Sequence, residues 1–211
     1  MQGADFFDVD HTITRRSSGR HFMLLGVRRG VFPLSSLLSF PLTYLRYRFF
    51  GRKAELPGLK GISLKDIEGV SRESFDESLM HDLYPDALTL IRRFQSSGRR
   101  VVLATSSIDF IVKPLADYLG ITEMIANSLV FEDGVCTGRF VDIPVFRQEK
   151  RKKVFEYIES RGISVEESSF YSDSIHDLPL LEDIGNPVAV NPDRSLKRIA
   201  EKRGWEILVF S

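Results

Sequence analysis

Two carboxylates separated by a single residue, Asp8 and Asp10, follow a short apolar run that begins at Ala4. A carboxylate can attack phosphorus and form a covalent intermediate, and a second carboxylate beside it can give and take the proton that the reaction moves. Repulsion between neighbouring carboxylates raises the pKa of one of them, which helps it to hold a proton near neutral pH. The pair predicts phosphoryl transfer, with Asp8 as the nucleophile and Asp10 as the acid and base.

Later segments of the chain supply the other groups that this reaction needs. Thr105 and Ser106 follow an apolar run, Lys150 opens a helical pattern, and Asp173 and Asp177 follow another apolar run. Hydroxyl groups and a lysine ammonium can bind the oxygens of a phosphoryl group. We therefore expect Thr105, Ser106 and Lys150 to bind phosphate, with Asp177 in a supporting role.

A metal ion is expected beside the nucleophile, because a phosphate dianion repels a carboxylate. Mg²⁺ prefers oxygen ligands and shares its coordination shell with substrate phosphate. The predicted ligands are the carboxylates of Asp8 and Asp173 and the backbone carbonyl of Asp10. The single cysteine, Cys136, excludes an internal disulfide and a cysteine-built metal site, and it favours a cytoplasmic setting.

Strand and helix patterns alternate through most of the chain and predict an α/β fold. Such alternation is typical of a parallel sheet covered by helices on both faces, with ligands bound beyond the carboxyl ends of the strands. A small β-hairpin is expected around Glu132-Asp133-Gly134. The expected strands are 4–9, 100–104, 169–172, 188–190 and 205–210, and the expected helices are 86–95, 108–119, 150–161, 176–181 and 195–202.

Residues 14–84 have helical rather than strand patterns, and we expect them to form a cap inserted into a core of residues 1–13 and 85–211. The stretch from His11 to Ala54 has no acidic residue, although the formal net charge of the whole chain is +0. This asymmetry favours either an anionic partner or a basic surface balanced by acidic neighbours. Val31 to Leu45 is very apolar, but prolines and serines interrupt it, and it is shorter than the ~20 residues of a spanning helix. The basic residues of the stretch are Arg15, Arg16, Arg20, Arg28, Arg29, Arg46, Arg48, Arg52 and Lys53.

These motifs resemble the haloacid dehalogenase superfamily, in particular its phosphoserine-phosphatase-like branch, subfamily IB. The resemblance implies a Rossmann-like core with a helical cap, Mg²⁺, and an aspartyl-phosphate formed on Asp8, with Asp10 as acid and base. The apolar, basic insert is similar in character to the cap of phosphatidylglycerophosphatase C. The segments that carry the resemblance are Phe6-Phe7-Asp8-Val9-Asp10-His11-Thr12, Thr105, Lys150 and Tyr171-Ser172-Asp173-Ser174-Ile175-His176-Asp177.

The sequence departs from the family pattern at several positions. His11 stands where many relatives have glycine, and the first acidic residue after Asp10 is Glu55. Phosphoserine phosphatases place an acid early in the cap to meet the amino group of the substrate, so this departure disfavours phosphoserine itself. His176 is interpreted as a helix-surface residue, since hard Mg²⁺ prefers oxygen ligands. Thr12, inside the first motif, is expected to support the site.

The expected substrate is a phosphorylated small molecule or a lipid phosphate, and no nucleic acid is expected as a partner. A lipid substrate would add peripheral contact with an anionic membrane, at the inner face. Three alternatives stay open: phosphoserine phosphatase proper, a membrane-associated binding module with an inactive core, and an HD-type metal phosphohydrolase. The last would recruit His21, His81-Asp82 and Asp109 or Asp117. Metal-dependent hydrolysis of an aryl phosphate distinguishes these classes.

Overall fold

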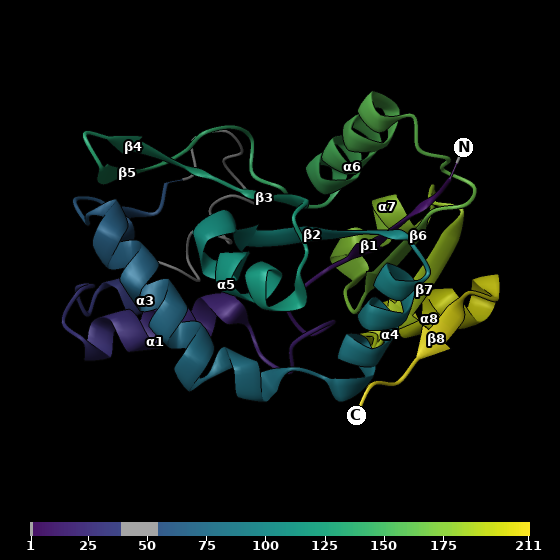
Figure 1. Ribbon diagram of the computed structural model, residues 1–211, viewed down its shortest axis with the longest axis horizontal. Helices are drawn as coiled ribbons and strands as arrows, with labels where there is room; N and C mark the ends of the chain where they lie inside the picture. The colour runs from purple at the N-terminus through teal and green to yellow at the C-terminus, as the bar shows by residue number, and fades with distance from the viewer. Residues whose placement is uncertain (1, 39–54) are drawn as a thin grey trace.

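The computed structural model describes residues 2–38 and 55–211 of the chain (Figure 1). The helices and strands are, in chain order, β1 (Ala4–Phe7), α1 (Ser18–Arg28), η2 (Pro57–Leu59), α3 (Leu64–Glu77), η3 (Leu79–Asp82), α4 (Pro85–Ser96), β2 (Arg100–Ile108), α5 (Asp109–Leu119), β3 (Met124–Asn127), β4 (Leu129–Glu132), β5 (Val135–Phe140), α6 (Gln148–Arg161), β6 (Ser169–Ser172), η4 (Ile175–Asp177), α7 (Leu178–Leu181), β7 (Asn186–Val190), α8 (Arg194–Arg203) and β8 (Glu206–Leu208). The labels η2, η3 and η4 denote short 3₁₀ helices.

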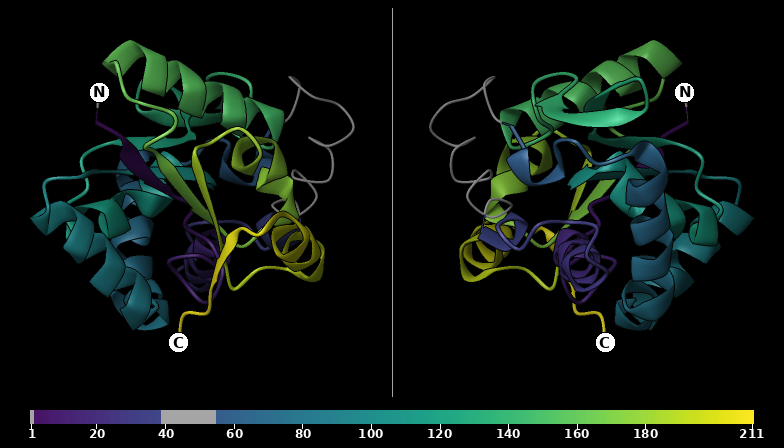
Figure 2. Two further views of the ribbon diagram at one scale, coloured as in Figure 1. Left: turned by 90° about the vertical axis from the view of Figure 1, so that its right-hand side faces the viewer. Right: turned by 90° about the vertical axis from the view of Figure 1, so that its left-hand side faces the viewer.

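A six-stranded parallel sheet in the order β3-β2-β1-β6-β7-β8 forms the centre of the molecule. Phe6 and Phe7 of β1 are both fully buried although they point to opposite faces. Phe7 packs in a cluster with residues of α4 and α5, and Phe6 packs in another with residues of α6, α7 and α8. Figure 2 shows helices on both faces of the sheet. The predicted Rossmann-like α/β fold is confirmed.

The sheet differs from the sequence-based prediction mainly at β2 and β3. The strand β2 continues through Ile108, so Thr105, Ser106 and Ser107 belong to the strand rather than to a loop after it. The edge strand β3 was not predicted, because three of its four residues are only partly buried and the strand has no clear alternation. The strand β1 ends at Phe7 instead of Val9.

The insert after β1 contains α1, η2, α3 and η3, and the hairpin β4-β5 packs against it (Figure 1). The backbone N–H of Gly61 donates to the carbonyl of Cys136 at 2.8 Å, and the N–H of Cys136 donates to the carbonyl of Ile62 at 2.8 Å. The insert and the hairpin also contribute side chains to the same hydrophobic cluster, although the hairpin comes much later in the chain. The division into a core of 1–13 and 85–211 and a cap of 14–84 stays a prediction. The hairpin belongs to the core by its place in the sequence, but it packs against the insert.

Residues 39–45 of the apolar run from Val31 to Leu45 lie outside the described residues, which stop at Leu38 and resume at Glu55. Within the described residues, no helix is both long enough and apolar enough to cross a membrane. Leu34 and Leu38 are 72% and 71% exposed at the edge of the described part of the insert.

An ion pair between a buried carboxylate and a partly exposed guanidinium joins β1 to the residue that precedes β2. The Asp5 carboxylate is 1% exposed, and the guanidinium of Arg99 binds it through Nε at 2.5 Å and Nη2 at 3.0 Å. Arg99→Ala is expected to lower the free energy of unfolding by about 3 kcal/mol, because it leaves the Asp5 charge buried and unpaired. Urea denaturation of the two proteins measures this loss.

Arg151→Ala is the matched control for this prediction. Arg151 pairs with Asp183, whose side chain is 44% exposed, so its removal should cost less than about 1 kcal/mol. Equal losses in the two variants would show that burial of Asp5 does not determine the effect.

Candidate active site

The nucleophile predicted from the sequence lies at the centre of the sheet edge. Phe7 pairs with Leu103 of β2 on one side and with Tyr171 of β6 on the other, so Asp8 begins the loop between the ends of these strands. The backbone N–H of Asp8 donates to the carbonyl of Tyr171 at 2.9 Å. The Asp8 side chain is 11% exposed. The Asp8 side chain is therefore mostly enclosed by protein, with a small opening toward solvent.

Lys150 connects this carboxylate to the fourth motif. Its Nζ lies 3.2 Å from Asp8 Oδ1 and 2.8 Å from Asp177 Oδ2, and the residue is 1% exposed. Ser172 Oγ donates to the same oxygen of Asp177 at 2.7 Å. Lys150 comes in the first turn of α6, which directs the ammonium toward the sheet edge. Asp177 thus holds Lys150 in place beside Asp8.

Asp10 faces the insert instead of the core. The backbone N–H of Ser18 donates to Asp10 Oδ1 at 2.7 Å, and Ser17 Oγ donates to Oδ2 at 3.4 Å. Ser17 is the N-cap of α1 and Ser18 is its first residue, at the helix end where unpaired backbone N–H groups favour a negative charge. Asp10 therefore accepts hydrogen bonds from the first helix of the insert.

Thr12 joins the first motif to the fourth, since its Oγ1 accepts a hydrogen bond from the backbone N–H of Asp173 at 3.1 Å. The side chain of Thr12 is fully buried. The contact fixes the loop that carries Asp173 next to the loop that carries Asp8 and Asp10. The supporting role of Thr12 in the reaction stays a prediction.

The hydroxyl residues of the second motif have different surroundings. Thr105 is 1% exposed, and its Oγ1 accepts from the N–H of Ser107 at 3.0 Å. Ser106 and Ser107 line the cleft described below, and Ser107 Oγ lies 2.9 Å from Ser18 Oγ of the insert. Asn127 at the end of β3 supports this segment, because its Nδ2 donates to the Ser106 carbonyl at 2.6 Å. Phosphate binding by Thr105 and Ser106 stays a prediction, to which the structure adds Ser107.

A cleft of about 270 Å³ opens at these strand ends and brings most of the predicted residues together. Thr12 and Thr105 are not among its lining residues. Several residues that the sequence analysis did not assign to the site also line it, notably Phe146, Ser174 and His176. The full lining is Asp8, Asp10, His11, Ser17, Gly19, Ser106, Ser107, Phe146, Lys150, Asp173, Ser174, His176 and Asp177.

The electrostatics of the cleft are dominated by an excess of negative charge. Burial raises the pKa of Asp8 to about 7 even though Lys150 opposes the shift, and Asp177 and Asp10 add to it. Burial, together with Asp8 and Asp177, raises the pKa of Asp173 to about 8. Burial lowers the pKa of Lys150, but Asp177 and Asp8 outweigh it, so this pKa lies above its ordinary value. The lining of the cleft thus contains four carboxylates but only one ammonium group, which contacts two of them.

This donor set fits a hard dication, which would balance the excess of negative charge with oxygen ligands. Among the residues described, no three or more His, Cys, Asp and Glu side chains gather closely enough to hold a metal by themselves. The predicted set does not need three, because Asp8 and Asp173 give carboxylates and Asp10 gives its backbone carbonyl. The carboxylate of Asp10 is bound by α1, which is consistent with this division. The assignment stays a prediction.

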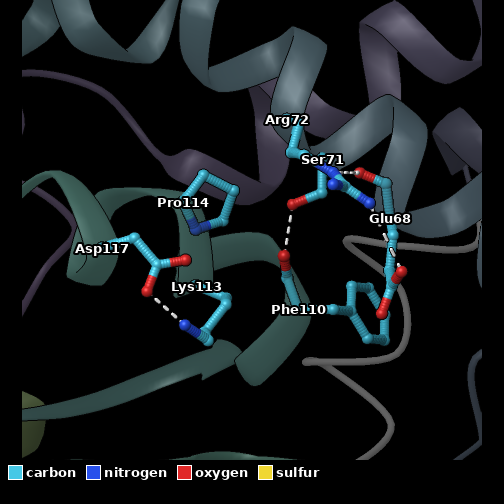
Figure 3. Close-up of a pocket in the computed structure, with 7 residues that line it drawn as sticks. All are labelled: Glu68, Ser71, Arg72, Phe110, Lys113, Pro114 and Asp117. Atoms are coloured by element: carbon cyan, nitrogen blue, oxygen red, sulfur yellow. Dashed lines mark hydrogen bonds and ion pairs between the residues drawn. The ribbon is translucent and has the colours of Figure 1, made fainter. Parts of the chain in front are cut away.

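A second cleft, of about 280 Å³, lies between α3 and α5 (Figure 3). Its charged side chains pair within their own helices, Lys113 with Asp117 and Arg72 with Glu68. Ser71 Oγ donates to the carbonyl of Phe110 across the helix pair. None of the residues predicted to bind phosphate or metal lines this cleft.

Of the residues that an HD-type site would need, the structure brings only His21 and Asp82 into contact. His21 Nε2 and Asp82 Oδ2 lie 2.5 Å apart. Asp109, however, accepts from Ser128 Oγ at 2.6 Å, and Asp117 pairs with Lys113. The pair of His21 and Asp82 therefore joins α1 to η3 and is not part of a metal cluster among the residues that the structure describes.

The basic residues of the insert are largely paired where the structure describes them. Arg28 binds Glu77, and Arg29 binds Glu73 and Glu77, so α1 and α3 are joined by ion pairs. Arg16 lies 3.4 Å from Asp82. These contacts support the interpretation of a basic surface balanced by acidic neighbours. Arg46, Arg48, Arg52 and Lys53 lie outside the described residues.

The family follows from comparison with known proteins. The model of the haloacid dehalogenase-like hydrolases matches residues 6–182. The chain therefore belongs to the haloacid dehalogenase-like hydrolase family, and the resemblance stated from its motifs is confirmed. The matched range contains all four motifs and therefore every residue predicted to take part in the reaction.

Two curated relatives are phosphatases by name. Phosphoserine phosphatase SerB1 of Mycobacterium tuberculosis is 28% identical, over 100% of this chain and 71% of that protein. Histidinol-phosphatase of Neisseria meningitidis serogroup C is 27% identical, over 100% of both chains. A crystal structure of a protein of unknown function from Bordetella pertussis Tohama I superposes with a TM-score of 0.84, at 28% identity over 99% of this chain and 98% of that one.

Proposed function

We propose that the chain is a Mg²⁺-dependent phosphatase that hydrolyses small, polar phosphomonoesters through an aspartyl-phosphate on Asp8. The observation that supports this most directly is the buried contact of 3.2 Å between Asp8 Oδ1 and Lys150 Nζ at the centre of the sheet edge. Lys150 places a positive charge beside the point of attack, and Asp177 fixes its position. The phosphatase names of the two relatives support the same reaction.

The reaction proceeds in two displacements at phosphorus. An oxygen of Asp8 attacks the phosphoryl group, and the bond from phosphorus to the leaving oxygen breaks while Asp10 donates a proton to that oxygen. Water then attacks the phosphorus of the aspartyl-phosphate and gives a proton to Asp10. Cleavage of the phosphorus–oxygen bond to Asp8 releases orthophosphate and restores both carboxylates to their starting states.

The residues assigned to the reaction contribute charge or position. Lys150 and the hydroxyl groups of Thr105, Ser106 and Ser107 would bind the phosphoryl oxygens, where negative charge is spread in the transition state. Asp8 and Asp173, with the carbonyl of Asp10, would hold Mg²⁺, which would neutralise the phosphate and the nucleophile. Thr12 keeps the Asp173 loop against the Asp8 loop.

A small polar leaving group agrees best with the described lining of the cleft. Phe146 is the one large apolar side chain among these lining residues, and apart from Gly19 the others are polar or charged. Phosphoserine itself is disfavoured, since no acidic residue stands between Asp10 and Glu55 to meet its amino group. Lipid phosphates are a second candidate substrate class because Leu34 and Leu38 are exposed on the insert.

The test is hydrolysis of a panel of phosphomonoesters with Mg²⁺ and with excess chelator. We expect activity that depends on Mg²⁺ and a radiolabelled protein after acid quenching with labelled substrate. The panel includes glycerol phosphate, phosphoserine, histidinol phosphate and a lysolipid phosphate with and without anionic vesicles. Undiminished activity in chelator would refute the metal requirement. A preference for the lysolipid that increases with vesicles would refute the small polar class.

A further inference from the structure

The loop that carries Asp173 is held by residues that follow both neighbouring strands. The strand β6 lies between β1 and β7 in the sheet, and Asp173 comes directly after it. On the β1 side, the backbone N–H of Asp173 donates to Thr12 Oγ1 at 3.1 Å. On the β7 side, the backbone N–H of Asp193 donates to the carbonyl of Asp173 at 2.8 Å. Both backbone polar groups of this predicted metal ligand are therefore fixed by hydrogen bonds.

The carboxylate of Asp193 has separate partners for its two oxygens. Oδ1 accepts from the backbone N–H groups of Ser195 and Leu196 at 2.8 Å and 2.9 Å, and it thereby caps the first turn of α8. Oδ2 accepts from the backbone N–H of Ile175 at 2.7 Å. One oxygen thus stabilises a helix, whereas the other reaches the loop two residues after Asp173.

The turn that carries Asp193 is anchored in its own right. Asn191 has a φ of 42°, in the left-handed region that asparagine tolerates better than most residues. Its Nδ2 donates to the carbonyl of Phe210 at 3.3 Å, and its Oδ1 accepts from the N–H of the same residue at 3.0 Å. Pro192 follows with a φ that its ring restricts. The side chain of Asp193 therefore extends from a turn with few alternative conformations.

Asp193 is not among the residues that line the described part of the catalytic cleft, so any effect on the reaction must pass through the loop. Metal ligands need support of this kind, because the productive geometry tolerates displacements of only about 0.5 Å. We propose, on the basis of the proposed function, that Asp193 is a positioning residue for the metal site. Its Oδ2 holds the loop after β6 in the conformation in which the Asp173 carboxylate binds Mg²⁺.

The test is Mg²⁺ binding to the Asp193→Ser variant, measured by isothermal titration calorimetry without substrate. Serine has one side-chain oxygen, which can cap α8, and it has no second oxygen for Ile175. The dissociation constant for Mg²⁺ should rise by about 10–100-fold, the usual effect of losing a group that supports a metal ligand. An unchanged dissociation constant would overturn the proposal.

The kinetics should show a split between Mg²⁺ dependence and maximal rate. In Asp193→Ser, the Mg²⁺ concentration that gives half-maximal hydrolysis should rise by the same factor as the dissociation constant. The value of kcat at saturating Mg²⁺ should return close to that of the wild type. Partial unfolding would instead lower the rate at every Mg²⁺ concentration, and that result would contradict a positioning role.

The charge of Asp193 is separated from its hydrogen bond by salt. A long-range effect of the lost charge is screened in about 1 M salt, where the Debye length is about 3 Å. The ratio of the Mg²⁺ dissociation constants of Asp193→Ser and the wild type should therefore be the same at low and high salt. A ratio that falls to one at high salt would assign the effect to charge and overturn the proposal.

Ser63→Ala is the matched control for the loss of a helix cap. The N–H of Asp66 donates to Ser63 Oγ at 3.1 Å and so caps α3, and Ser63 is not a lining residue of the catalytic cleft. The variant should have a lower Tm but an unchanged affinity for Mg²⁺. Equal weakening of Mg²⁺ binding in Ser63→Ala and Asp193→Ser would overturn the specific role of Asp193.

Amide hydrogen exchange at Ile175 gives a readout that needs neither metal nor activity. Exchange should be about tenfold faster in Asp193→Ser than in the wild type, the effect of one lost hydrogen bond. Equal exchange in the two proteins would overturn the proposal. Absence of both Mg²⁺ binding and hydrolysis in the wild type would instead refute the proposed function, and the exchange result would still decide whether Asp193 holds the loop.

Discussion

Asp8→Asn is expected to abolish the hydrolysis of every phosphomonoester, by about 10⁴-fold or more. The amide keeps the shape of the carboxylate but cannot attack phosphorus, and it is a poor ligand for a hard cation. Lys150 would keep its contact with Asp177 at 2.8 Å, so the cleft should hold its form. The measurement is single-turnover release of phosphate, together with the amount of acid-stable radiolabel on the protein, which should fall to background.

Asp183→Asn is a suitable control, because Asp183 is exposed and pairs with Arg151 outside the cleft. It should keep wild-type activity. If Asp8→Asn keeps activity within tenfold of the wild type, or still acquires the label, then Asp8 is not the nucleophile.

Asp10→Asn should slow hydrolysis of alkyl phosphates by roughly 10²–10⁴-fold, the usual effect of a positioned acid and base. The leaving group of an activated aryl phosphate needs less protonation. The substitution should therefore slow formation of the intermediate less with an aryl phosphate than with an alkyl phosphate. The dependence of the rate on the pKa of the leaving group should therefore become steeper in the variant. Burst kinetics with a series of aryl phosphates measure this slope. Equal slopes in the two proteins would remove Asp10 from the role of acid.

The sequence predicted the parts of the site that follow from local pattern. The apolar runs before Asp8 and Asp173 predict buried strands of a parallel sheet. The carboxyl ends of parallel strands meet at one edge of the sheet. Lys150 was recognised because it opens a helix after the hairpin. These positions need only the order of elements, which alternating patterns contain. The fold and the meeting of these residues at one edge of the sheet were therefore predictable, while their roles in catalysis stay predictions.

The contacts between the insert and the core were not predictable in the same way. Ser18 donates to Asp10 and meets Ser107, 89 residues away, because of the angle at which α1 leaves the first motif. No local pattern specifies that angle. The hairpin was predicted, but its backbone pairing with Gly61 and Ile62 depends on a turn far from it in the chain. Tertiary packing determines both.

His176 shows another limit of the sequence interpretation. A single histidine in a short helix resembles a surface residue, but His176 is partly buried, lines the cleft and contacts Arg147. That arginine takes a left-handed backbone conformation without a glycine to indicate it. His11, with φ of 63°, has the same property, and here the glycine of many relatives was a usable indication.

The hydrogen bonds at the start of α1 connect Asp10 to the insert, whereas Asp8 is held by the sheet. Under the proposed mechanism, proton transfer by Asp10 would depend on the position of α1, while attack by Asp8 would not. A displacement of α1 would leave the predicted nucleophile in place but would remove two hydrogen bonds from the predicted acid and base.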